Sequence, residues 1–211
     1  MLHLTKFSDH GLVLHTVDSE AGRRSFLLRG IKHGNAVAVF HPLGLLDVVS
    51  AESPKSSLAY LREWEPAAAL HSVRSDRVKS SIALFLSEVL YRSLTSELAD
   101  PGLFSWICAA VETLEGAEGS VANYPLWFLV CYAVKLGFMP GEPIEPSGIF
   151  DERDEALLRQ LLKASFPEAM AIPLSSSRRL SLSRKLLQYL SWHLGANIDA
   201  RSLDVLHAVL A

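Results

Sequence analysis

The sequence predicts an α+β protein in two parts, a five-stranded β-domain over residues 1–75 and an all-α helical bundle over residues 76–211. Two observations predict this fold class. Short apolar runs separated by turn residues fill the first 65 residues, and longer segments with helical apolar spacing follow them. The 211 residues are 49% hydrophobic and 20% charged, which is typical of a folded protein with a sizeable core.

Five short apolar runs predict the strands of the β-domain. They are residues 12–17, 25–29, 36–40, 45–49 and 58–64. Glycines and the KHGN and HPLG stretches lie between them, as expected for turns. Runs of this length and spacing indicate an antiparallel sheet or small barrel of the size of an OB-fold. We expect Phe7, Phe26 and Phe40 to lie in its core, because aromatic residues at strand positions are usually buried.

Helical spacing of apolar residues begins at residue 77. The segments with this spacing are 77–94, 103–114, 124–138, 151–162, 180–194 and 201–210. The third is apolar nearly all round, which predicts a helix in the middle of the bundle. Pro125 falls near its start, where the missing N–H costs nothing. Loops rich in Pro, Gly and Ser at 140–148 and 173–177 separate the later helices.

Composition excludes several classes of protein. Cys108 and Cys131 are the two cysteines, too few for a four-cysteine zinc site or a disulfide scaffold. His3, His10 and His15 match no metal-ligand spacing, and the common nucleotide-binding and acyl-transfer motifs are absent. We therefore expect no metal, no cofactor and no enzymatic activity. No apolar run reaches the ~20 residues that span a bilayer, so we expect a cytoplasmic protein.

Charge is distributed unevenly along the chain, although the net charge is only −3. Residues 1–80 hold 10 Lys and Arg against 8 Asp and Glu, residues 81–172 hold 5 against 13, and residues 173–211 hold 5 against 2. An acidic middle thus lies between two basic ends. This asymmetry is compatible with a local anion-binding surface that the total conceals.

The stretch SSSRRLSLSRKLLQYLSWHL, residues 175–194, holds four cations, two in the predicted helix over 180–194 and two at or just before its N-terminus. One face is formed by Leu182, Leu186, Tyr189, Leu190 and His193, and the opposite one by Arg184, Gln188 and Ser191. Two interpretations are open. The cations form the solvated face of an amphipathic helix, or they contact a polyanion. In both cases we expect their side chains to be exposed.

The order of motifs resembles the RecO family of bacterial recombination-repair proteins along nearly the whole chain. The resemblance rests on FLLRGIKHGN and HPLGLLDVV near the N-terminus, and on KSSIALFLSEVLYRSL, LFSWICAAVETLE and NYPLWFLVCYAVKLGFMP in the helical part. GIFDERD, SRKLLQYLSWHLG and RSLDVLHAVL complete it. Each motif is degenerate, and their order and spacing together are specific. The chain departs from relatives that carry a four-cysteine zinc motif, because it has two cysteines.

The resemblance implies an OB-fold followed by a helical bundle, and a non-enzymatic mediator of DNA repair and recombination. Such a protein binds single- and double-stranded DNA, anneals complementary strands, and acts with RecR to load RecA on strands coated by single-strand-binding protein. It would also bind the acidic C-terminal tail of single-strand-binding protein. Association with the bacterial nucleoid follows from the same resemblance.

Cations at the two basic ends are the candidate DNA contacts, because phosphates are bound without sequence preference by a basic surface. They are Lys6, Arg23, Arg24, Arg29, Lys32, His33, Arg178, Arg179, Arg184 and Lys185. A receptor for an acidic tail needs an apolar pocket beside a cation. The candidates for it are Trp127, Val130, Lys135 and Leu136. The alternative function is a helical protein-interaction adaptor with weak or no DNA affinity, which the acidic middle region favours.

Overall fold

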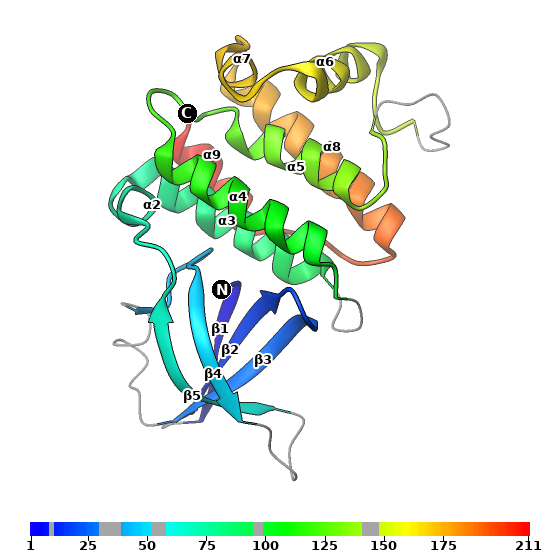
Figure 1. The fold of residues 1–211 in the computed structure, drawn as a ribbon. Helices are drawn as coiled ribbons and strands as arrows, with labels where there is room; N and C mark the ends of the chain where they lie inside the picture. The colour runs from blue at the N-terminus through cyan, green and yellow to red at the C-terminus, as the bar shows by residue number, and fades with distance from the viewer. Residues whose placement is uncertain (9–10, 30–38, 52–57, 95–98, 141–147) are drawn as a thin grey trace.

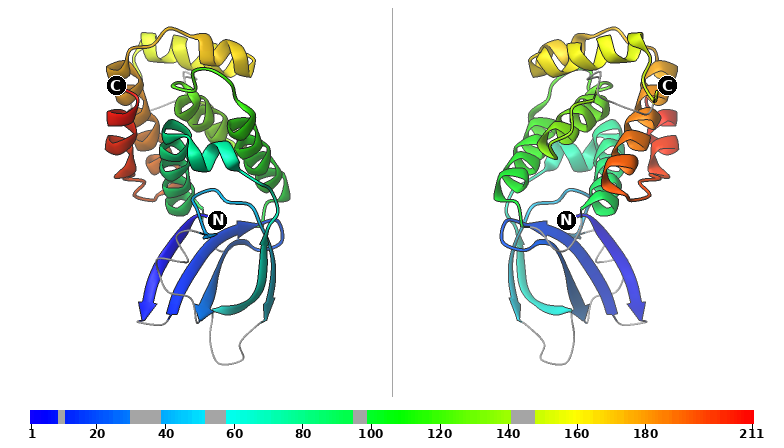
Figure 2. Two further views of the ribbon diagram at one scale, coloured as in Figure 1. Left: turned by 90° about the vertical axis from the view of Figure 1, so that its left-hand side faces the viewer. Right: turned by 90° about the vertical axis from the view of Figure 1, so that its right-hand side faces the viewer.

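The chain folds into an open five-stranded sheet followed by a layered group of helices (Figure 1). The computed structural model describes residues 1–8, 11–29, 39–51, 58–94, 99–140 and 148–211. The α+β fold class is confirmed. The side views show the sheet at one end of the molecule and the helices at the other (Figure 2).

Five strands form one sheet in the order β1-β2-β3-β5-β4. Their bounds are His3–Ser8 (β1), Gly11–Asp18 (β2), Gly22–Arg29 (β3), Leu46–Ala51 (β4) and Ala59–Pro66 (β5). β3 and β5 pair in parallel, and the other neighbours are antiparallel. Within the described residues no ladder joins β1 to β4, so the sheet is open and the expected barrel is not confirmed.

The strand predictions differ from the structure at two places. β1 was not expected, because HLTKFS contains few β-branched residues and lacks a clear apolar run. The expected strand at 36–40 falls partly outside the described residues, and Phe40 itself lies in a bend. Phe26 and Phe40 are buried in the sheet's own core, as expected. The prediction for Phe7 is wrong, since its side chain is 64% exposed.

The helices agree with the predicted segments to within a few residues. Their bounds are Arg77–Ser93 (α3), Pro101–Gly116 (α4), Tyr124–Lys135 (α5), Glu152–Lys163 (α6), Ser176–Leu194 (α8) and Ser202–Val209 (α9). Two short helices, His71–Ser75 (α2) and Phe166–Ala171 (α7), were not predicted. They hold five and six residues, too few for a periodic pattern to show.

Carboxylates at the helix starts explain several of these boundaries. The Asp76 side chain accepts hydrogen bonds from the backbone N–H groups of Val78 and Lys79, and Asp100 accepts one from Leu103 before Pro101 opens α4. Asp151 and Asp154 form a reciprocal capping box at α6. Each cap satisfies backbone donors that have no partner within the helix.

α5 runs through the middle of the helical layer, as its apolar sequence predicts. Leu129, Val130 and Tyr132 are fully buried there, and Tyr132 Oη lies 2.7 Å from Ser93 Oγ of α3. The buried side chains of the helices form one large core, and the sheet has a second, smaller core around Leu14 and Phe26. The two cores explain why the strands and helices occupy separate parts of the molecule.

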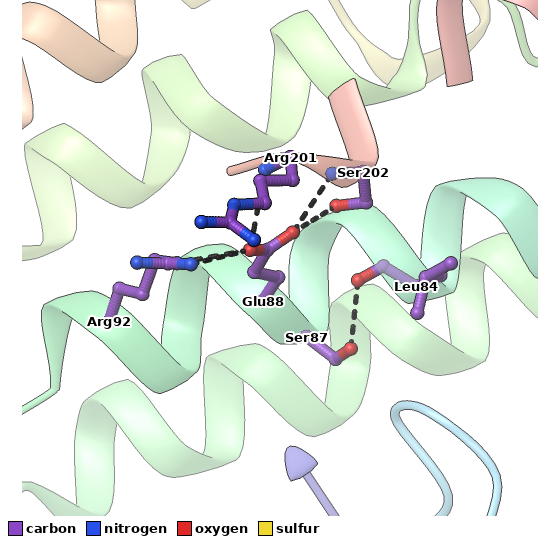
Figure 3. A network of polar contacts seen from close by, with 6 residues as sticks. All are labelled: Leu84, Ser87, Glu88, Arg92, Arg201 and Ser202. Atoms are coloured by element: carbon purple, nitrogen blue, oxygen red, sulfur yellow. Dashed lines mark hydrogen bonds and ion pairs between the residues drawn. The ribbon is translucent and has the colours of Figure 1, made fainter. Parts of the chain in front are cut away.

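Glu88 connects α3 to the start of α9 (Figure 3). Its carboxylate accepts hydrogen bonds from the backbone N–H groups of Arg201 (3.3 Å) and Ser202 (3.0 Å), from Ser202 Oγ, and from the Arg92 guanidinium. Burial acts to raise the pKa of Glu88, but the hydrogen bonds from Ser202 and Arg92 outweigh it and lower that pKa. The contact therefore stabilises the fold at neutral pH, and that contribution is lost as the pH falls through the lowered pKa.

Candidate nucleic-acid interface

One face of the sheet gathers cations, histidines and aromatic rings. The register places His3 opposite His15, and His15 opposite Ser25. Side chains alternate between faces along a strand, so Arg23 and Arg29 of β3 share the face of Ser25. Arg23 lies at the end near the helices and Arg29 at the far end.

At the far end, Arg29 and Tyr60 form a cation–aromatic pair. The guanidinium carbon lies 4.9 Å from the ring centroid, and Arg29 Nη2 donates a hydrogen bond to Tyr60 Oη at 3.2 Å. The exposed Lys6 and Phe7 occupy the end of β1, whose partner strand β2 begins opposite Arg29. This end of the sheet therefore offers a cation and exposed aromatic surface together.

At the near end, Arg23 connects the sheet to the helices and is not a free surface cation. Its Nη1 donates a hydrogen bond to the Tyr91 carbonyl at 2.9 Å, and its guanidinium lies 4.0 Å from the centre of the Tyr91 ring. His3 and His15 also contact this ring. Burial lowers the pKa of both histidines, and the neighbouring Arg23 lowers it further. This cluster holds α3 against the sheet.

The remaining predicted cations of the β-domain are divided between the other face and an undescribed segment. Arg24 alternates with Arg23 and lies over the Phe26 ring, 3.6 Å from Asp18. Lys32 and His33 lie outside the described residues. Lys6 and Arg29 thus lie at the same end of the sheet, but the register sets Lys6 opposite Leu12 and Leu12 opposite Leu28, which places Lys6 on the face of Arg24.

Two of the four α8 cations bind one buried carboxylate. Arg178 Nη1 lies 2.8 Å from Oδ1 of Asp154, and Lys185 Nζ donates a hydrogen bond to Oδ2 of the same residue. The Asp154 side chain is fully buried at the start of α6, and the exposed Asp151 lies 3.7 Å from Lys185. The expectation that Arg178 and Lys185 are exposed is wrong, since both are half-buried, because they hold α8 to α6.

Arg179 and Arg184 contact the segment that ends the chain. Arg179 donates hydrogen bonds to the carbonyls of Leu174 (2.6 Å) and Leu210 (3.0 Å), so the expectation of an exposed side chain is also wrong for Arg179. Arg184 is exposed and lies 3.0 Å from Asp204, whose side chain is 75% exposed. Of the four cations, Arg184 is the one whose side chain is open to solvent.

The four residues predicted to receive an acidic tail differ in their exposure. Val130 is fully buried, and Trp127 packs between the rings of Tyr124 and Phe166. Leu136 packs partly against the core, and Lys135 is exposed at the end of α5. A partner therefore cannot reach Val130 in the folded protein.

The described residues lack the groupings that a metal site or a membrane-spanning helix would need. Nowhere in that part of the chain do three His, Cys, Asp or Glu side chains gather in a way that could hold a metal ion. No described helix is both long enough and apolar enough to cross a bilayer. Cys108 and Cys131 are free thiols, each partly buried.

Sequence reasoning missed Tyr60, Tyr91 and Asp154. Tyr60 and Tyr91 meet the arginines of β3 through pairings between distant segments, which no local pattern reveals. Asp154 had a signal, because DERDEALL opens a helix with carboxylates that favour its N-terminus. Its burial and its two cationic partners come from the packing of α6 on α8.

Comparisons with known proteins agree on one family. The family described as Recombination protein O C terminal matches residues 74–141. A protein named DNA repair protein RecO from Flavobacterium psychrophilum is 25% identical over 98% of this chain and 94% of its own length. Proteins of the same name are 27% identical in Porphyromonas gingivalis, over 92% and 90%, and 30% identical in Phocaeicola vulgatus, over 71% and 64%.

Proposed function

Because this chain belongs to the RecO family of bacterial DNA recombination-repair proteins, we propose that it acts in DNA repair and recombination by binding single- and double-stranded DNA and annealing complementary strands. The observation that supports this most is the far end of the sheet, where Arg29 and Tyr60 form a pair and the exposed Lys6 and Phe7 lie at the end of β1. No catalytic step is proposed.

The chemistry of these residues suits a single strand. A guanidinium binds phosphate oxygens, and an aromatic ring stacks on any base, so the combination holds a strand without reading its sequence. Annealing needs this property, since base edges must stay free to pair. The faces of β2 and β3 are also where OB-folds commonly receive nucleic acid.

The double variant Phe7→Ala, Arg29→Ala tests this interface. We expect its affinity for a single-stranded oligonucleotide to fall by about tenfold to a hundredfold, since one stacked base is worth about 1–3 kcal/mol. The slope of log affinity against log salt should become shallower by roughly 0.7, the value for one lost phosphate contact. Fluorescence anisotropy at four salt concentrations measures both quantities.

A matched control removes the same kinds of group elsewhere. Trp192 is 54% exposed on α8 and Arg159 is exposed on α6, so Trp192→Ala, Arg159→Ala also loses one exposed aromatic and one arginine. Its affinity should stay within about twofold of wild type. Equal losses in the two variants, or no loss in either, would reject the sheet as the DNA-binding surface and favour the adaptor function.

α8 is proposed as a second, weaker DNA contact through Arg184. Arg178, Arg179 and Lys185 already serve the fold, so they should affect DNA binding less than their number suggests. Arg184→Ala should make the salt slope shallower by roughly 0.7, with an unchanged midpoint of unfolding. An unchanged slope would leave α8 with a structural role alone.

Partners are proposed from the family. They are RecR, RecA indirectly, and the acidic tail of single-strand-binding protein. Lys135 at the end of α5 supports the last of these, since it is exposed beside the partly buried Leu136. Lys135→Glu should weaken binding of a labelled tail peptide, and unchanged affinity would remove Lys135 from the site.

A further inference from the structure

β4 lies at the edge of the sheet. It ends the strand order, and among the described residues it pairs with β5 alone. Val48 and Val49 on it are 39% and 54% exposed. An edge strand offers unpaired backbone N–H and C=O groups, to which another extended segment can add.

Two hollows lie along this edge strand. The larger, of about 320 Å³, lies between the sheet and α4, with apolar walls that include Leu43, Leu46, Phe104 and Ile107. The second, of about 270 Å³, is lined by residues 47–49 of β4 and 63–65 of β5. Asp47 and Val48 line both, so the two hollows adjoin each other at β4. The larger hollow is big enough to receive apolar side chains.

The charged side chains that line the two hollows are of one sign. Their described linings contain five carboxylates and neither lysine nor arginine, the carboxylates being Asp18, Asp47, Glu63, Glu65 and Glu112. Asp47 lies directly opposite Glu65 in the β4–β5 ladder, an arrangement that destabilises a strand pair unless a cation neutralises it. Asp18 has Arg24 nearby, 3.6 Å away. This surface repels phosphates and favours cationic groups.

We propose that the β4 edge and its two hollows bind an extended basic segment of a partner protein. The segment adds to the sheet as a strand beside β4, places an apolar side chain in the hollow against α4, and sets lysines or arginines over the carboxylates. DNA is disfavoured here by charge. A second copy of this chain is disfavoured as well, because pairing two β4 edges brings like carboxylates together. The inference does not depend on DNA binding at the Arg29–Tyr60 pair.

Synthetic octapeptides test the proposal directly. In three series, Val and Leu alternate with Lys, with Ser or with Glu, and each peptide is acetylated, amidated and fluorescently labelled. The Lys series should bind the full chain at least about tenfold more tightly than the Ser series, and the Glu series least of all. Bound Lys peptide should slow amide hydrogen exchange in residues 47–50, as strand addition requires. Equal binding of the Lys and Ser series, or unchanged exchange in β4, would overturn it.

Charge-matched variants separate this surface from general attraction. Asp47→Lys, Glu63→Lys, Glu65→Lys should weaken the Lys peptides at least about tenfold. Glu20→Lys, Glu118→Lys, Glu152→Lys makes the same change in net charge at exposed sites outside the two linings and should change affinity less than about twofold. Similar losses in the two triples would reject the site.

Filling the larger hollow provides a test that leaves the charges unchanged. Cys108 lines the hollow from α4 and is partly buried. Cys108→Phe should weaken the Lys peptides about tenfold while the thermal unfolding midpoint stays near that of wild type. Full affinity in this folded variant would show that no apolar side chain enters the hollow, and would contradict the proposal.

Discussion

Replacing Asp154 by alanine should lower the free energy of unfolding by about 3–5 kcal/mol, the usual cost of removing one partner from a buried ion pair. The Asp154 carboxylate is fully buried and binds both Arg178 and Lys185. Without it, two half-buried cations lose their partner, and the capping box of α6 loses one member. Urea denaturation followed by circular dichroism measures the change.

Asp204→Ala is the matched control, because Asp204 also pairs with an arginine of α8. Its side chain is 75% exposed and that of Arg184 is 60% exposed, so the loss should be under about 1 kcal/mol. Asp154→Ala combined with Arg178→Met and Lys185→Met should recover part of the lost stability, since no unpaired charge then remains. Equal costs for Asp154→Ala and Asp204→Ala would contradict the buried role assigned to Asp154.

Lys79→Met should lower the free energy of unfolding by about 2–3 kcal/mol. The Lys79 side chain is buried, and its Nζ donates hydrogen bonds to Ser72 Oγ (2.6 Å) and to the carbonyls of Glu115 (2.9 Å) and Ala117 (2.7 Å). It thereby satisfies carbonyls at the end of α4, and methionine fills the same space without a donor. The stability is lost because the carbonyl oxygens of Glu115 and Ala117 are left without a donor, and one unsatisfied buried acceptor costs about 1–3 kcal/mol.

Lys163→Met serves as the comparison, because Lys163 is an exposed lysine in the last turn of α6. Its effect should stay within ~0.5 kcal/mol. Glu115 binds the same region from the other side, since its carboxylate accepts hydrogen bonds from the N–H groups of Ser72 and Val73 at 2.8 Å. A loss in Lys79→Met no larger than in Lys163→Met would show that water replaces the ammonium group.

The helices could be predicted from the sequence because their signals are local. Apolar spacing and caps such as Asp76 and Asp151 act within a few residues, and the structure has helices at all six predicted places. β1 could not be predicted, since HLTKFS becomes a strand by pairing with β2 and has a weak pattern of its own. The parallel pairing of β3 with β5 likewise depends on residues more than thirty positions apart.

The candidate site was less predictable than the fold. Arg29 and Lys6 were predicted from charge alone. Their proposed role in binding a single strand also depends on Tyr60 and Phe7, which neither charge nor periodicity singles out. For α8, the concentration of cations was correctly noticed, and its main cause is a carboxylate on another helix. A charged segment indicates that a counter-charge exists, while the sequence leaves open whether that partner is internal or external.

The contact between α3 and α9 also has a consequence for the order of folding. The sheet needs only the first 66 residues, so its ladders can form while the rest of the chain is still being synthesised. Glu88 can pair with Arg92 within α3 at once, but it must wait for Ser202, 114 positions away, before it gains its partners in α9. Closing so long a loop costs entropy before any contact repays it, which slows the final step. Until residues 201 and 202 have been synthesised, the side of α3 that carries Glu88 therefore lacks its contact with α9.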